Sequence, residues 1–137
     1  PVRAIRALGR DPSIEVTGTV ADVRPHAWRA AVSVAPLGVA RGIQNKVIEA
    51  MAMGIPVVAS SAAAHGVDAI AGEHLSTADD PDATAAAIIR LLDDPTERRR
   101  LAQAGRERML SHHSWPRVLA KLDAMIAAWL GIDLTKP

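Results

Sequence analysis

Residues 45–60 read NKVIEAMAMGIPVVAS, and this stretch contains the repeating unit of the fold. Its first half predicts a helix from about Asn45 to Met53, which Gly54 ends. Its second half, residues 55–60, is almost entirely apolar. Such a run is typical of a parallel strand that is covered on both faces. The stretch therefore predicts a helix that leads directly into a buried parallel strand.

The same alternation of helices and strands extends in both directions along the chain. Upstream, Ile14–Val20 alternates with a period of two and predicts a strand, and residues 31–36 predict another. Downstream, a short strand is expected around residues 74–78. Helices are expected over 1–9, over 23–30 with Asp22 as its N-cap, and after Asp80-Pro81, Asp94-Pro95 and Ser114. Strands separated by crossover helices predict an α/β fold, a Rossmann-like doubly wound parallel sheet with flanking helices.

The helix after Ser114 carries apolar residues at strict helical spacing. We expect this set to pack into the core, with part of its face exposed where the helix runs near another domain. The set consists of Trp115, Val118, Leu119, Leu122, Met125, Ile126 and Trp129.

Length and composition exclude several classes of protein. The 137 residues make one domain, and 49% apolar residues suffice for a sizeable core. A net charge of +1 and the near absence of aromatic residues argue against nucleic-acid binding. The absence of cysteine excludes disulfides, thiolate metal sites and a cysteine nucleophile. The chain opens at Pro1 rather than Met, and we expect it to be a fragment of a longer protein.

Two loops are candidates for ligand binding, because ligands of open α/β sheets bind outside the carboxyl ends of the strands. One loop runs from Gly18 to Asp22, and the other from Leu37 to Asn45, into a helix start that could hold a phosphate. Lys46 in the first turn is unfavourable for the helix dipole unless an anion lies nearby. Glu49, on nearly the same face, could accept hydrogen bonds from ribose hydroxyls. The alternative is a surface Lys46–Glu49 pair that only stabilises the helix.

The segment from Arg41 to Ala59 resembles the nucleotide-sugar signature of group 1, family 4-like retaining glycosyltransferases of the GT-B fold. That signature has a glutamate, seven residues, a second glutamate, a helix of small residues, Gly-x-Pro and a Val-Val-Ala strand. The likeness covers essentially the whole chain. The variant Gly42-Ile43-Gln44-Asn45-Lys46 looks most like bacterial sugar transferases of exopolysaccharide assembly. Its further matching stretches are Val16-Thr17-Gly18, Asp22-Val23, Val34-Ala35-Pro36-Leu37, residues 91–95 and Ser114-Trp115.

The resemblance implies a role for each matching residue. Glu49 matches the second glutamate, which holds the donor ribose. Gly42 begins the stretch whose backbone amides approach the donor sugar and diphosphate, a stretch that continues through Ile43, Gln44, Asn45 and Lys46. The segment from Gly18 to Val20 falls where family members line the base pocket.

The chain departs from the signature at its first glutamate, whose position holds Arg41. A carboxylate contact to the sugar hydroxyls is therefore not expected. Gln44 and Lys46 also stand where many members have glycine and proline. Arg41 and Lys46 are the basic residues nearest the site, and we expect them to stabilise the charge of the leaving group in catalysis. For Arg41 two alternatives stay open: it recognises an acidic donor sugar such as a uronic acid, or it only faces solvent.

The resemblance further implies that residues 1–137 are a partial C-terminal domain, without the acceptor domain and the domain's own first strand. The implied reaction is hexosyl transfer from a nucleoside-diphosphate sugar with retention, without metal or cofactor, to a glycan or lipid-linked acceptor held by the N-terminal domain. The implied location is cytoplasmic, at the inner face of the membrane, and is compatible with peripheral membrane association. This fragment alone is expected to be inactive.

Two other functions remain open. A non-catalytic GT-B-like module would bind a nucleotide without transfer, and Arg41 in place of the glutamate favours it. A nucleotide-sugar epimerase could use the same fold. His65 follows the apolar strand and either contacts the donor or serves the turn, whereas the adjacent His112 and His113 face different directions and make no metal pair.

Overall fold

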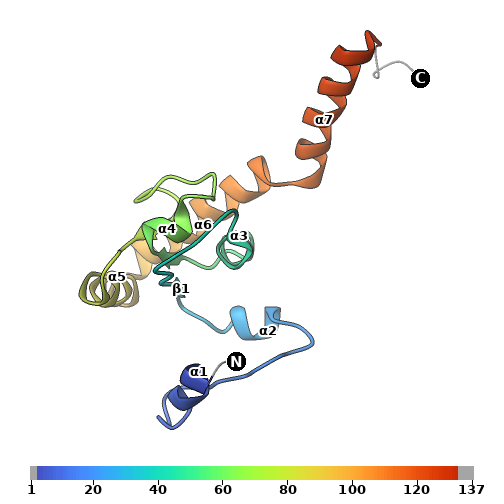
Figure 1. Ribbon diagram of the computed structural model, residues 1–137. Helices are drawn as coiled ribbons and strands as arrows, with labels where there is room; N and C mark the ends of the chain where they lie inside the picture. The colour runs from blue at the N-terminus through green and yellow to red at the C-terminus, as the bar shows by residue number, and fades with distance from the viewer. Residues whose placement is uncertain (1–2, 133–137) are drawn as a thin grey trace.

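The computed structural model describes residues 3–132 (Figure 1) and contains a sheet of three short parallel strands. They are β1 (Ser33–Ala35), β2 (Val57–Ala59) and β3 (Ser76–Thr77), in the order β1-β2-β3. Both pairs of neighbouring strands are parallel, with Val34 opposite Val58 and Ala59 opposite Thr77. The predicted α/β fold class is confirmed.

Seven helices are present in the described residues, and Asp-Pro pairs begin two of them as predicted. The Asp80 carboxylate accepts from the Ala83 amide at 2.8 Å, and that of Asp94 accepts from the Glu97 amide at 3.0 Å. Ser114 stands at the N-cap of the last helix without a side-chain cap bond. The helices are α1 (Arg3–Leu8), α2 (Arg24–Ala27), α3 (Asn45–Ala52), α4 (Ser61–Ala64), α5 (Pro81–Asp93), α6 (Pro95–His112) and α7 (Trp115–Leu130).

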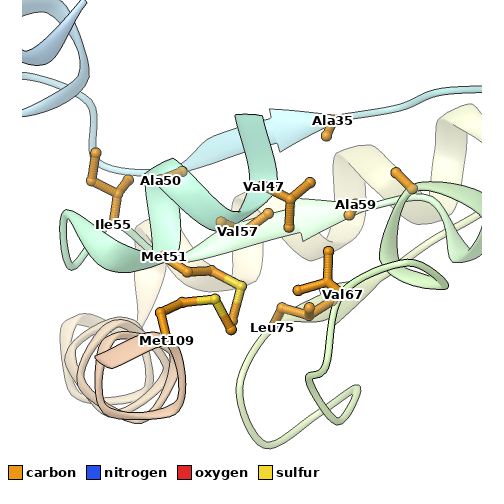
Figure 2. Packing of buried hydrophobic residues seen from close by; sticks show 11 residues of the cluster. Ala35, Val47, Ala50, Met51, Ile55, Val57, Ala59, Val67, Leu75 and Met109 are labelled. Atoms are coloured by element: carbon orange, nitrogen blue, oxygen red, sulfur yellow. The ribbon is translucent and has the colours of Figure 1, made fainter. Parts of the chain in front are cut away.

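The larger core joins α3 to the sheet and to α6. Val47 and Met51 of α3 are fully buried, and Met51 meets Met109 of α6 in Figure 2. Gly105 of α6 allows this close packing, because a Cβ there would lie 2.7 Å from the carbonyl oxygen of His74. Helix α3 thus packs on both β2 and α6.

A smaller core joins β2 to α5 and α6 through Val58, Ala78, Leu91 and Leu101. Leu91 is 0% exposed, whereas its neighbour Leu92 is 47% exposed on the same helix. The two positions therefore separate the effect of burial from that of helix propensity.

We expect Leu91→Ala to lower the free energy of unfolding by about 2–5 kcal/mol, because it removes buried methyl groups and leaves a cavity. Leu92→Ala should change it by less than about 1 kcal/mol. Urea unfolding of both variants measures the difference. Equal destabilisation by the two substitutions would contradict the placement of Leu91 in the core.

The predicted strand over residues 14–20 is wrong. Within residues 3–132 this segment pairs with no strand, and most of its side chains are exposed. Gly18 interrupts the extended backbone with a φ of 69°, in the left-handed region. Alternating hydrophobicity indicates which face a strand would bury. It does not show that a neighbouring strand pairs with the segment or that another element packs on its apolar face.

The prediction that the apolar residues of the last helix pack into the core is wrong for the six whose side chains are described, and the side chain of Val118 lies outside the described residues. Helix α7 projects away from the sheet in Figure 1, and Trp115 and Trp129 are 77% and 85% exposed. The spacing specifies an apolar helix face, and within the described residues nothing covers that face. Contact of this face with another domain stays a prediction.

Candidate functional site

The loop over residues 37–44 leaves the carboxyl end of β1 and leads into α3. Its first residue is fixed to the next strand, because the Ser60 hydroxyl donates to the Leu37 carbonyl oxygen at 2.7 Å. The same hydroxyl oxygen accepts from the Ala63 amide at 3.1 Å and so caps α4. One serine thus connects the loop to the end of β2.

The start of α3 has backbone N–H groups with no protein acceptor. Its N-cap residue, Gln44, makes no side-chain cap bond, and the first turn holds no acidic residue. Among the described residues, the amides of Asn45 and Lys46 donate to no group of the protein. Helices α4, α5 and α6 each have a side-chain cap instead. The start of α3 therefore has the donors and the dipole that an anion requires.

The loop before α3 is folded back by its own side chains and backbone. Gly42 adopts a φ of 65°, which a residue with a Cβ rarely takes. The side-chain amide of Gln44 donates to the carbonyl oxygens of Arg41 at 3.1 Å and Gly42 at 3.4 Å. The side chain of Gln44 thus holds both carbonyl oxygens by hydrogen bonds. These bonds fix the shape of the loop before any ligand binds.

Glu49 lies one turn inside α3 and faces the segment before α2. With residues 21–24, Ala52 and Met53, it lines an open cleft of about 440 Å³. Lys46 and Glu49 share a smaller hollow of about 200 Å³ with Val23 and Ala27. No ion pair forms between Lys46 and Glu49 in the described part of the chain, so the surface-pair alternative is not what the structure shows.

The far wall of this cleft is an ion pair that sequence reasoning missed. The Arg24 guanidinium contacts the Asp22 carboxylate at 2.9 Å, and the Arg24 amide donates to the same carboxylate at 2.9 Å. These hydrogen bonds lower the pKa of Asp22 and keep it charged. The sequence identified Asp22 as an N-cap candidate, but the N-cap position is occupied by Val23.

The other residues that the sequence predicted for the site lie in separate parts of the structure. Val20 directly precedes residues 21–24, which line the cleft together with Glu49. Gly18 instead lines a separate hollow, with Arg6, Gly9, Ile14 and Val16. Arg41 and Ile43 are exposed in the loop before α3, and His65 is exposed at the end of α4. The structure thus brings Glu49 together with residues 21–24 and with the start of α3, but not with Gly18.

A larger cavity, of about 580 Å³, lies at the carboxyl ends of the strands on the α5 side. Its polar side chains already bond to the protein. The Asp79 carboxylate accepts from the amide and the hydroxyl of Ser61, both at 2.7 Å, and Asp80 caps α5. This cavity therefore offers a ligand few groups that could orient it, unlike the start of α3.

Within residues 3–132, no three His, Asp or Glu side chains lie close enough to hold a metal ion. None of the helices in that range has the length and apolarity needed to cross a bilayer.

Known proteins resemble this chain in sequence. The family model described as "Glycosyl transferases group 1" matches residues 2–94. An MMP alpha-(1->4)-mannosyltransferase of Mycolicibacterium hassiacum is 35% identical over 130 residues, which cover 90% of this chain and 31% of that protein.

Solved structures agree. A sucrose-phosphate synthase from Thermosynechococcus elongatus superposes with a TM-score of 0.78 at 26% identity, over 93% of this chain and 33% of its own. The C-terminal domain of a group 1 glycosyl transferase from Francisella tularensis gives 0.69 at 20% identity, over 82% of this chain and 60% of its own, and shows the fold alone. The chain thus spans about a third of the mannosyltransferase and of the synthase. The expected fold, one half of a GT-B fold, is confirmed, and the chain belongs to the group 1 glycosyl transferases.

Proposed function

We propose that this chain is the donor-binding part of a two-domain glycosyltransferase. It binds a nucleoside-diphosphate sugar at the start of α3, and the complete protein transfers the sugar with retention. The observation that carries this proposal is the uncapped start of α3 with Glu49 one turn inside it, facing the cleft of residues 21–24. Family membership supports the substrate class.

Each part of the donor has a matching part of the site. The amides of Asn45 and Lys46, with the Lys46 ammonium, bind the diphosphate. The Glu49 carboxylate accepts hydrogen bonds from the ribose hydroxyls. The base lies in the cleft next to Val20, against residues 21–24. Gly42 and Ile43 bring their backbone close to the donor sugar.

The transfer needs no metal in this proposal. Backbone amides at a helix start and nearby cations stabilise the negative charge that develops on the leaving diphosphate. Lys46 supplies one cation in the first turn of α3, and Arg41 supplies another from the loop. Both side chains are exposed and, among the described residues, in no ion pair.

The acceptor, a glycan or a lipid-linked sugar, binds to the other domain of the protein. The apolar face of α7, which includes Trp115 and Trp129, supports this arrangement because it has no cover among the described residues. The proposed reaction belongs to bacterial glycan biosynthesis, and the likeness of the sequence to transferases of exopolysaccharide assembly supports this assignment.

Arg41 distinguishes this site from those with the family glutamate. A guanidinium cannot accept hydrogen bonds from sugar hydroxyls, but it pairs bidentately with a phosphate or carboxylate. We expect Arg41→Ala to lower kcat/KM with the preferred donor by about tenfold or more, since a hydrogen bond to a charged group contributes about 1.5–3 kcal/mol. Arg41→Glu should lower it further, or shift preference from acidic to neutral sugars. Wild-type kcat/KM in both variants would remove Arg41 from the site.

A panel of UDP-, GDP-, ADP- and TDP-sugars in a thermal-shift assay tests the proposal on the full-length protein. A donor present at 100 times its Kd stabilises the folded state by about 2.7 kcal/mol, so one base should raise the Tm clearly above the others. No shift with any of the four, at millimolar concentration, would contradict nucleotide-sugar binding.

A second candidate is a module that binds a nucleotide without transferring a sugar. The replacement of the family glutamate by Arg41 favours it. The two functions differ in turnover, because a transferase slowly hydrolyses its donor even without an acceptor. Release of the nucleoside diphosphate by the full-length protein supports the transferase, and binding without any release supports the module.

A further inference from the structure

The segment after α4 packs backbone against backbone on the loop that precedes α3. A Cβ on Gly66 would clash with the carbonyl oxygen of Gly42 and would lie 3.2 Å from the Cα of Ile43. Real Cβ atoms do not approach a backbone oxygen so closely, so any other residue at position 66 must displace one of the two segments. The position of the Gly42 loop therefore depends on the position of Gly66.

Directly after Gly66, the chain is fixed to helix α6. Val67 is buried in the larger core, and Figure 2 shows it beside Leu75. Asp68 is held by Arg108, whose Nε donates to the Asp68 carbonyl oxygen at 2.8 Å and whose Nη2 pairs with the Asp68 carboxylate. The hydrogen bond from Arg108 to the carboxylate also lowers the pKa of Asp68. Because one guanidinium binds both the backbone and the side chain of Asp68, it restrains the residue in position and in direction.

Helix α6 also holds the far end of the same segment. Arg100 donates to the carbonyl oxygens of Gly72 at 2.8 Å and Glu73 at 3.3 Å. Through Met109 the same helix packs on Met51 of α3. Helix α6 thus supports both the helix that starts at the proposed diphosphate site and the segment that presses on the loop before it.

We propose that Asp68 and Arg108 are positioning residues for the donor loop. By fixing the segment after α4, the pair holds Gly66 against Gly42 and so directs the backbone of residues 42–46 toward the diphosphate. Neither residue touches the donor in this arrangement, and the effect passes through Gly66. This inference rests on the proposed function, because it names what orients the site for the diphosphate.

The test uses the full-length protein and its Asp68→Ala and Arg108→Ala variants. Calorimetry measures binding of UDP, GDP, ADP and TDP, and of the matching nucleosides. For the base that binds, we expect the diphosphate affinity to fall by about five- to tenfold, the lower range of coupling between sites. The affinity for the nucleoside should stay unchanged, since it does not reach residues 42–46.

Gln103→Ala is the matched control, because it removes an exposed hydrogen bond to Glu107 on the same helix without touching the segment after α4. Hydrogen exchange without ligand gives an independent readout. In Asp68→Ala the amides of residues 42–46 should exchange faster than in the wild type, and in Gln103→Ala they should not.

The outcomes separate the two proposals. Wild-type binding of a diphosphate, combined with unchanged affinity and unchanged loop exchange in Asp68→Ala, overturns the positioning role alone. An equal loss of diphosphate and nucleoside affinity also overturns it, because that pattern shows general destabilisation. A wild-type protein that binds none of the four diphosphates overturns the proposed function, and the positioning role with it.

Discussion

Glu49→Ala in the full-length protein is expected to weaken nucleotide binding by about 10- to 150-fold. The Glu49 carboxylate faces the cleft of residues 21–24 and has no protein partner among the described residues. A hydrogen bond from a ribose hydroxyl to a charged carboxylate contributes about 1.5–3 kcal/mol, which gives this range of affinities. Calorimetry with the preferred nucleoside diphosphate measures the loss.

Two further variants show whether that loss is specific. Glu107→Ala removes an exposed glutamate from α6, far from the start of α3 in the sequence, and should bind as the wild type does. Glu49→Gln keeps the shape and one acceptor oxygen, so its loss should be smaller than that of the alanine variant. Because Glu49 is exposed, all three variants should unfold at wild-type urea concentrations. Unchanged affinity in Glu49→Ala would assign Glu49 to the helix surface.

The 137-residue chain on its own is expected to transfer no sugar, a complete loss relative to the full-length enzyme. It contains one α/β unit and spans about a third of the related mannosyltransferase. In the proposed enzyme the acceptor and the groups that activate it belong to another domain, so the chain holds the donor without a second substrate.

Assay of the purified chain beside the full-length protein, with the same donor and acceptor, checks this expectation. Adding the separately produced N-terminal part should restore measurable transfer, if the two parts associate through the apolar face of α7. Robust transfer by the chain alone would contradict the proposal that a second domain binds the acceptor.

The sequence around α3 and β2 predicted the structure well, because local signals there agree with the tertiary contacts. The helix over 45–53 and the strand over 55–60 appear as Asn45–Ala52 and Val57–Ala59. The small residues and the glycine that ends the helix point to the same fold as the buried strand does. Residues 14–20 carry an equally clear period, yet form no strand, because pairing is a property of the partner as much as of the segment.

The sequence predicted two separate stretches of the candidate site, the loop from Gly18 to Asp22 and the start of the helix at Asn45, but not how they meet. The sequence between residues 44 and 49 shows the start of a helix, Lys46 in its first turn and Glu49 one turn inside it. The cleft that Glu49 shares with Asp22 and Arg24 brings together residues more than twenty positions apart, and so does the contact of Gly66 with Gly42. Spacing along the chain carries no signal for such contacts, and Gly66 in particular is indistinguishable from an ordinary loop glycine.

The most direct test of donor binding at the start of α3 is hydrogen exchange of the full-length protein with and without its preferred nucleoside-diphosphate sugar. We expect the donor to slow exchange in peptides that cover residues 42–49 and 20–24, because amides at the start of α3 donate to the diphosphate and the base fills the cleft. Protection confined to residues 78–88, which line the larger cavity beside α5, or no protection in either region, would contradict donor binding at α3.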